Sequence, residues 1–556
     1  MRLISLFTAL LCAALGLPVL GVLGAWLAAD AQAWATLVHQ WNTVLPAYAL
    51  NSAVLVTAVA LGVTLMGAGA AAAVTLFEFP GRSVFEWALL LPLAMPTYVL
   101  AYAYTDALQF SGPLQSALRL AFGLEGALWP DVRSLGAAVV LFTLALYPYV
   151  YLLTRTALAE RGVQMMEAAR LLGAGFWRRV AEVALPLARP AIVAGVALAL
   201  METLADYGVS AFFGLDTLAT GIYKAWLAMN DRWAAAQLAS LLLVVVALLL
   251  WMERRAQARL RFASTRQGPA SSQDARPLHL RGGLALLALI LCGVPVLLGF
   301  VVPVALLLRL LWQEWQFSEW GLPVAAFANW AWASFRLALV AAGLATGLAL
   351  LLAFLQRFNQ RSGAGGWDRL AHAGLGFGAQ VMGLGYAVPG GVIAVGILLP
   401  LAWLQAVVPQ WGLPALFTGT VAGLMMAYLV RFSAVALQAV ESGYARVPVA
   451  VDDTARLLGA HPIRVLRELH LPLLRRSALA ALLLVFVDVM KELPATLVLR
   501  PFNADTLAVV AFNLARDERL GEAALPSLAI VLVGLIPVVL LSRALRAAPG
   551  PSPNTP

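Results

Sequence analysis

Four carboxylates fall inside otherwise apolar stretches of this chain, in two matched pairs. Glu202 and Asp206 form the first pair, and Asp488 and Glu492 form the second. The members of each pair are four residues apart, so both carboxylates lie on one face of a helix. The two pairs are separated by 286 residues at both positions. Carboxylate oxygens are hard ligands that suit a highly charged cation, so the four acids are candidate ligands for transient contact with a hard metal ion.

Two other interpretations of these acids stay open. Lys491 lies three residues from Asp488 and is placed to neutralise part of the second pair, which favours structural pairing or gating. Simple exposure at the outer end of a span is the remaining alternative. Tyr207 offers a phenolate oxygen for the same chemistry, although tyrosines at membrane edges are common anchors. The residues predicted to line a translocation pathway are Glu202, Asp206, Tyr207, Asp488, Lys491 and Glu492.

The apolar stretches around these acids indicate a polytopic membrane protein. Of 556 residues, 62% are hydrophobic and 12% are charged, whereas soluble domains carry about 25% charged residues. The runs are continuous and lack the alternation of barrel strands, so we predict an all-α fold with six spans in each half. Runs of about 20 apolar residues occur near 5–29, 47–76, 84–109, 134–154, 190–211, 233–252, 283–311, 331–356, 372–400, 414–435, 477–498 and 521–543.

Arginine placement predicts the orientation of these spans. Arginines gather in the stretches 155–189, 253–282 and 446–476, whereas 30–46, 313–330 and 401–413 contain neither lysine nor arginine. Basic loops face the cytoplasm, so both chain termini are expected there, and the first apolar run is expected to be an uncleaved span. The net charge of +9 follows from these loops, so no nucleic-acid partner is expected, and lipid is the surrounding phase.

One polar segment between the spans occurs twice in register. Glu167-Ala168-Ala169-Arg170-Leu171-Leu172-Gly173 returns 286 residues later as Asp453-Thr454-Ala455-Arg456-Leu457-Leu458-Gly459, and each copy is followed by a matched glutamate (Glu182, Glu468) and proline (Pro186, Pro472). Glycine tolerates a left-handed backbone and suits a turn between two short helices. Topology alone explains the arginines but not the matched glycine, glutamate and proline. The loops therefore predict a docking surface for a partner that is present twice.

The repeated loop resembles the cytoplasmic loop of ATP-binding-cassette (ABC) importer permeases. In that family the loop forms a coupling helix that inserts into a cleft on a separate ATPase subunit. The resemblance implies two tandem parallel six-helix repeats of the binding-protein-dependent importer permease (type I, MetI-like) fold, and a bacterial inner-membrane location. It also implies two ATPase subunits and a periplasmic substrate-binding protein as partners. The implied coupling residues are Glu167, Ala168, Ala169, Arg170, Gly173, Asp453, Ala455, Arg456 and Gly459. The second copy departs from the family pattern where Asp453-Thr454 replaces Glu-Ala.

A second resemblance concerns the cargo. The stretch Met490-Lys491-Glu492-Leu493-Pro494, continuing through Asn503 to Asp505-Thr506-Leu507, resembles ferric-iron importer permeases, as does the first-half stretch from Tyr207-Gly208 to Trp226. It implies that Fe(III) is received from a periplasmic binding protein. Related fused permeases for thiamine or an organophosphonate remain an alternative. An ion-gradient-driven secondary transporter is the alternative of another class.

The chain itself is not expected to be an enzyme. A P-loop needs a glycine-rich turn followed by lysine, and neither Lys224 nor Lys491, the only lysines, follows such a turn. We therefore expect no catalytic residue and no cofactor bound by this chain, with ATP and Mg²⁺ used by the partner ATPase. Cys12 and Cys292 lie in apolar runs and are expected to be small hydrophobes rather than disulfide or metal-ligand cysteines. His461 and His470, in the second loop, are expected to be surface residues.

Four stretches are predicted along the chain. A first permease half covers 1–252, and a second covers 283–546. The segment 253–282 lacks apolar periodicity and contains serine, glycine and proline, so it is predicted to be a flexible cytoplasmic linker. The proline-rich end, 547–556, is predicted to be a disordered tail.

Overall fold

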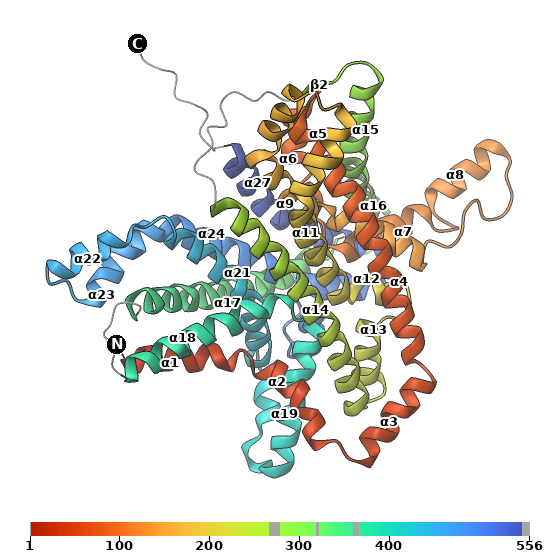
Figure 1. Cartoon of the computed structure of the whole chain (residues 1–556). Coiled ribbons are helices and arrows are strands. Elements are labelled where there is room, and N and C mark those ends of the chain that lie inside the picture. The colour runs from red at the N-terminus through yellow and green to blue at the C-terminus, as the bar shows by residue number, and fades with distance from the viewer. Residues whose placement is uncertain (1, 266–277, 318–321, 360–365, 547–556) are drawn as a thin grey trace. The chain divides into compact units, whose positions relative to one another are not determined.

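The computed structural model describes residues 2–265, 278–317, 322–359 and 366–546 (Figure 1). Long apolar runs without period-2 alternation fold into helices because a helix satisfies its own backbone hydrogen bonds. Beside these helices the described residues form one pair of short strands, β1 (Phe77–Glu78) and β2 (Leu278–His279), which run parallel with Phe77 opposite Leu278. The predicted all-α polytopic fold is thereby confirmed.

Among the described residues, nine helices are long and apolar enough to cross a membrane, or eleven if each of two bent pairs is one span. The bent pairs join Ile4–Ala14 to Leu17–Leu27 at 47° and Arg82–Ala94 to Thr97–Phe122 at 90°. The predicted run at 477–498 forms a helix as well, Leu471–Met490, which carries two arginines and an aspartate and is not among those nine. The predicted run at 372–400 is divided between two helices.

The chain folds into two compact units. Unit 1 comprises Met1–Asn42, Gly221–Leu243 and Val324–Val510. Its helices are α1 (Arg2–Ala14), α2 (Leu17–Gly24), α3 (Ala31–Asn42), the first part of α14 (Arg232–Thr265), α17 (Val324–Asn359), α18 (Gly366–Leu384), α19 (Gly390–Val407), α20 (Leu413–Gly419), α21 (Ala422–Tyr444), α22 (Val449–Leu457), α23 (Pro462–Arg464), α24 (Leu471–Met490), α25 (Pro494–Leu499) and the start of α26 (Leu507–Arg516), with short 3₁₀ or π turns η1 (Ala25–Ala28), η5 (Lys224–Ala228), η7 (Gly385–Ala387), η8 (Pro409–Trp411) and η9 (Val465–His470).

The first helices of the chain pack within unit 1 on helices from the second half of the sequence. α1 lies along α18, and α2 lies along α19 (Figure 1). At the second crossing a Cβ on Gly21 would lie 2.5 Å from the Gly396 carbonyl oxygen, so only glycine permits the close approach. Farther along, the Trp26 indole donates a 2.9 Å hydrogen bond to the Ser240 hydroxyl. These contacts tie the N-terminal segment to unit 1.

Unit 2 comprises Thr43–Thr220, Val244–Pro323 and Ala511–Pro556. Its helices are α4 (Leu45–Val63), α5 (Gly69–Leu76), α6 (Arg82–Ala88), α7 (Thr97–Leu108), α8 (Pro113–Phe122), α9 (Leu135–Leu171), α10 (Phe176–Arg179), α11 (Leu185–Ala205), α12 (Gly208–Phe212), α15 (Gly283–Val296), α16 (Val302–Phe317) and α27 (Leu520–Arg546), with turns η2 (Thr64–Ala68), η3 (Leu91–Ala94), η4 (Val180–Ala184) and η6 (Leu297–Val301), and α13 (Leu218–Tyr223) spans the boundary between the units. α9 is its central helix and packs on α4, α5 and α11.

The last helix of the chain packs within unit 2. α27 lies against α16 and against η3. A Cβ on Gly534 would lie 2.4 Å from the Ala94 carbonyl oxygen, so this crossing is also built on a glycine. The compact units therefore do not coincide with the predicted halves 1–252 and 283–546. Each half contributes its opening helices to the unit that the other half mainly builds.

Both described ends of the predicted linker contain regular structure. Residues 253–265 continue helix α14, and Leu278–His279 forms β2. The middle of the predicted linker, 266–277, and the predicted tail, 547–556, lie outside the described residues.

Candidate functional site

The first repeated loop begins at the end of α9, a helix of 37 uninterrupted residues. The helix ends at Leu171, two residues before Gly173, whose φ is +82°. The Gly173 N–H donates to the Arg170 carbonyl, and the Ala174 N–H donates to the Ala169 carbonyl, both at 3.0 Å. This pattern closes a helix with a left-handed residue. No atom would crowd a Cβ on Gly173, so the backbone conformation alone selects glycine there.

The second repeated loop makes the same turn. α22 ends before Gly459, whose φ is +74°. The Ala460 N–H donates to the Ala455 carbonyl at 3.0 Å, as Ala174 does in the first loop. The glycine turn predicted for both loops is therefore present in both.

Each turn is followed by a short helix that becomes a π-helical turn. α10 leads into η4 in the first loop, and α23 leads into η9 in the second. An ion pair repeats across this junction: Arg178 lies 2.9 Å from Glu182, and Arg464 lies 2.8 Å from Glu468. All four side chains are more than half exposed.

Both loops present adjacent leucines to the outside. Leu171 and Leu172 are 85% and 88% exposed, and Leu457 and Leu458 are 88% and 82% exposed. Exposed apolar side chains that recur at the same place in two loops are typical of a protein-binding surface. Among the predicted coupling residues, Glu167, Ala168, Arg170, Gly173, Asp453 and Gly459 are exposed and Ala169 and Ala455 are half-buried. The side chain of Arg456 lies outside the described part of the structure.

In unit 2 the predicted carboxylates lie where helix α11 breaks. Asp206 follows α11 and accepts a 2.9 Å hydrogen bond from the Val209 N–H of α12 through Oδ1. Its Oδ2 accepts a 2.7 Å hydrogen bond from the Thr97 hydroxyl. Glu202 lies one turn earlier and is half-buried. The Tyr207 ring packs against Phe512, with 5.7 Å between ring centroids.

In unit 1 the matching break follows α24. Glu492 is 5% exposed, and its Oε1 accepts from the Ala495 N–H at 2.8 Å while its Oε2 accepts from the Thr496 N–H at 2.9 Å. The Arg431 guanidinium lies 3.6 Å from Oε1 of the same carboxylate. Asp206 and Glu492 therefore both bind the first N–H groups of the helix after the break, which is what an N-terminal cap does.

The second acid of unit 1, Asp488, forms the ion pair that its spacing suggests. Its Oδ1 lies 2.9 Å from the Lys491 ammonium, and the Lys491 side chain is 32% exposed. Within the described residues, no group of three or more histidine, cysteine, aspartate or glutamate side chains is arranged to hold a metal ion. The predicted contacts of Glu202, Asp206, Asp488 and Glu492 with a passing cation stay a prediction.

Two serines that the sequence did not single out anchor the helices after these breaks. The Leu218 N–H donates to the Ser52 hydroxyl at 3.0 Å in unit 2. The Leu507 N–H donates to the Ser334 hydroxyl at 2.8 Å in unit 1. Both leucines stand third in an Asp-Thr-Leu motif. A lone serine inside an apolar span was the available signal.

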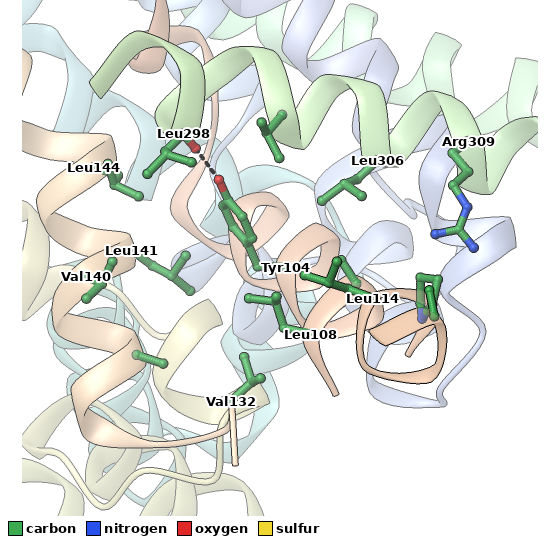
Figure 2. A pocket seen from close by; sticks show the side chains of 15 residues that line it. Tyr104, Leu108, Leu114, Val132, Val140, Leu141, Leu144, Leu298, Leu306 and Arg309 are labelled. Atoms are coloured by element: carbon green, nitrogen blue, oxygen red, sulfur yellow. Dashed lines mark hydrogen bonds between the residues drawn. The ribbon is translucent and has the colours of Figure 1, made fainter. Parts of the chain in front are cut away.

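An apolar cavity of about 730 Å³ lies in unit 2, apart from the predicted carboxylates (Figure 2). Figure 2 shows Tyr104 pointing toward Leu298 of η6. The Tyr104 hydroxyl donates a hydrogen bond to the Leu298 carbonyl. Arg309 stands at one end of the cavity and is the one charged residue among those that line it. With no carboxylate in its lining, this cavity does not have the ligands expected for a hard cation.

Comparisons with known proteins identify the family of this chain. Residues 63–262 match the family described as binding-protein-dependent transport system inner membrane components. Over 504 residues the chain is 24% identical to the Fe(3+)-transport system permease protein FbpB 2 of Haemophilus influenzae. This alignment covers 89% of each of the two chains. It is 30% identical over 191 residues to the molybdenum transport system permease protein ModB of Escherichia coli, covering 33% of this chain and 81% of that one.

A sulfate transport system permease protein, CysT of Escherichia coli, is 30% identical over 194 residues, covering 33% of this chain and 66% of its own. The single-half relatives match about a third of this polypeptide, whereas the ferric relative matches nearly all of it. The chain belongs to the family of binding-protein-dependent transport system inner membrane components and carries both halves of an ABC importer permease in one polypeptide.

Proposed function

We propose that this permease moves ferric iron from a periplasmic binding protein into the cytoplasm of a bacterium. The observation that carries the proposal is the match to a Fe(3+) permease along 504 residues and 89% of both chains. The molybdenum and sulfate permeases match only about a third of this chain. A match that includes both halves and the segment between them favours Fe(III), the ion in the name of that relative, as the cargo.

The charges at the helix breaks support a cation as cargo. The two breaks carry the four carboxylates Glu202, Asp206, Asp488 and Glu492. Of these, Asp488 lies 2.9 Å from the Lys491 ammonium, and Glu492 lies 3.6 Å from the Arg431 guanidinium. Carboxylates are suited to attract a cation rather than molybdate or sulfate. Oxygen ligands also suit hard Fe(III) better than a soft metal.

The contacts suggest different tasks for the two acids of each pair. The carboxylate oxygens of Glu492 accept from backbone N–H groups of the following helix. Those of Asp206 accept from one such N–H group and from the Thr97 hydroxyl. These contacts favour the structural alternative for both acids. We assign Glu202 and Asp488 as the acids that contact cargo. Contacts of this kind must be weak enough for the ion to leave again.

The two repeated loops are proposed to be the sites where ATP hydrolysis acts on the permease. Two ATPase subunits would dock on the surfaces around Gly173 and Gly459, with the exposed leucines buried at each contact. Closure of the ATPase pair would move the loops and open the pathway toward the periplasm. The binding protein would then release its ion, and hydrolysis would restore the inward-facing state. This scheme places both chain termini in the cytoplasm.

Uptake by the reconstituted assembly tests the proposal. The permease, its cognate ATPase and its binding protein would be placed in proteoliposomes, and entry of radiolabelled Fe(III) would be compared with molybdate, sulfate, thiamine and 2-aminoethylphosphonate. We expect ATP-dependent uptake of iron alone. Uptake of another cargo instead of iron would overturn the iron assignment. Uptake that continues with a hydrolysis-deficient ATPase would overturn the importer mechanism and favour an ion-gradient-driven transporter.

A further inference from the structure

The two coupling segments are joined to their spans in different ways. In the first half, α9 runs from Leu135 through Leu171, so the coupling segment is a direct extension of the span. In the second half, α21 ends at Tyr444 and α22 begins at Val449. Pro448 stands directly before α22, whereas Gly162 holds the matching place inside α9. Proline lacks an N–H and disfavours helical backbone in the residue before it. A break in the helix, called the joint below, therefore separates the second coupling helix α22 from its span α21.

A broken helix leaves carbonyl groups without intrahelical partners, and Arg357 binds those of the joint. Arg357 lies near the end of α17, and its Nη1 donates a hydrogen bond to the Tyr444 carbonyl at 3.2 Å. Its Nη2 donates to the carbonyls of Val447 at 2.9 Å and Pro448 at 3.1 Å. A planar guanidinium presents several donors in a fixed geometry, so one side chain serves three carbonyls.

Asp452 connects this arginine to the coupling helix itself. Its Oδ2 lies 2.6 Å from Arg357 Nε, and the two side chains are 8% and 14% exposed. On its other side, Oδ1 lies 2.6 Å from His470 Nε2. Tyr444 completes the group, with its hydroxyl 3.2 Å from His470 Nδ1. His470 is 2% exposed, so its expected place at the surface was wrong: it is buried as a partner of Asp452.

The matching positions of the first half carry no charge. Tyr444, Asp452 and His470 correspond, 286 residues earlier, to Leu158, Met166 and Ala184. Those three are buried together in one apolar cluster that also includes Leu76 and Ala188. The uninterrupted helix α9 has no freed carbonyls at this point, so it needs no arginine there, and no aspartate to balance one.

We propose that Arg357 and Asp452 are positioning residues that hold the jointed second coupling helix at a fixed angle to α17 and α21. The first coupling helix transmits motion as a rigid extension of its span. The second transmits it through this buried ion pair. The inference rests on the proposed ATPase docking at the loops, and it predicts that removing one charge uncouples the second loop alone.

Asp452→Asn tests the inference because it removes the charge and keeps the size of the side chain. In proteoliposomes with the ATPase and binding protein, import and ATP hydrolysis would be measured together. We expect import per ATP to fall at least fivefold while hydrolysis continues. A folding defect alone would lower both rates in proportion and leave this ratio unchanged. Amide hydrogen exchange should quicken in 449–457 and stay unchanged in 163–171.

Met166→Leu is the matched control, since it alters the equivalent position without altering charge, and its ratio should equal that of the wild type. If Asp452→Asn does not accumulate, Arg357→Lys takes its place, because lysine keeps the charge but cannot serve three carbonyls at once. An unchanged ratio together with unchanged exchange in 449–457 would overturn the inference. Failure of the wild-type assembly to import with ATP would instead overturn the proposed function.

Discussion

Arg178 and Glu182 form an ion pair of 2.9 Å that Arg464 and Glu468 repeat at 2.8 Å in the second loop. Exposed ion pairs contribute little to stability, so stability alone does not account for the repetition. Each pair spans the junction between a short helix and a π-helical turn. The repetition gives the two loops the same pattern of charge and the same exposed leucines, which fits the proposed docking of two copies of one partner.

Loss of the exposed leucines should weaken ATPase docking. Burying a leucine stabilises a complex by about 1.5–3 kcal/mol, and about 1.4 kcal/mol corresponds to a tenfold change in affinity. Replacing both Leu457 and Leu458 with asparagine should therefore weaken binding of the purified ATPase by at least about a hundredfold. Titration of the ATPase against permease in lipid nanodiscs would measure it.

The control for this change is another leucine of equal exposure. Leu120, on α8, is 88% exposed and belongs to neither loop. Leu120→Asn should leave ATPase affinity unchanged. Equal affinities for wild type and the double loop variant would show that the leucines lie outside the docking surface.

A side chain at either glycine turn should disturb coupling. Left-handed backbone costs a residue with a Cβ about 1–2 kcal/mol, so Gly173→Ala and Gly459→Ala should distort the turn and slow import. In contrast, Gly136 lies inside α9, and nothing would crowd a Cβ added there. Gly136→Ala should leave import unchanged and raise stability by up to about 1 kcal/mol. Import rates and thermal midpoints of the three variants would be compared, and normal import by both loop variants would contradict the expectation.

The repeated loops were predictable because their information lies in spacing along the chain. A shared offset of 286 residues identified Gly173 and Gly459 as turns before their φ angles were known. The caps made by Asp206 and Glu492 were not predictable in the same way. Their donors are backbone N–H groups that become free only where a helix breaks, and no side-chain pattern marks those donors. The burial of His470 was not predicted because its partner, Asp452, lies on another helix.

The composition of the two compact units was also hidden from the sequence. The apolar spans have similar compositions, so neither their sequences nor their order along the chain indicates which of them pack together. The choice depends on local fit, as where Gly21 meets Gly396 and Gly534 meets Ala94. Hydropathy therefore located the spans but not their neighbours.

Glu492 and Asp488 should respond differently to loss of charge. Glu492→Gln leaves the buried Arg431 without its carboxylate, and breaking a buried ion pair costs about 3–5 kcal/mol. We expect a lower thermal midpoint and an unchanged KM for iron in the molecules that stay folded. Asp488→Asn breaks a more exposed pair with Lys491, so its thermal midpoint should change little while its KM for iron rises.

Thermal unfolding in detergent and the concentration dependence of iron uptake separate these outcomes. Glu202→Gln is the companion of Asp488→Asn in the first half and should also raise KM. A rise in KM for Glu492→Gln without any loss of stability would reverse the assignment of structural and cargo-contacting acids.

Strong acid should weaken the pair of Arg357 and Asp452. Burial would raise the pKa of Asp452, but the hydrogen bonds from His470 and Arg357 outweigh it and hold the pKa below the ordinary value of 3.8. A carboxylate whose pKa is lowered by folding contributes stability that is present above its ordinary pKa and lost as the pH falls through the folded-state value. The difference in thermal midpoint between wild type and Asp452→Asn should therefore shrink as the pH is lowered from about 5 to about 3.

Met166→Leu changes no titratable group, so its difference in thermal midpoint from wild type should not depend on pH. A wild-type advantage over Asp452→Asn that persisted in full at the acid end would mean that the advantage does not come from an ionised carboxylate.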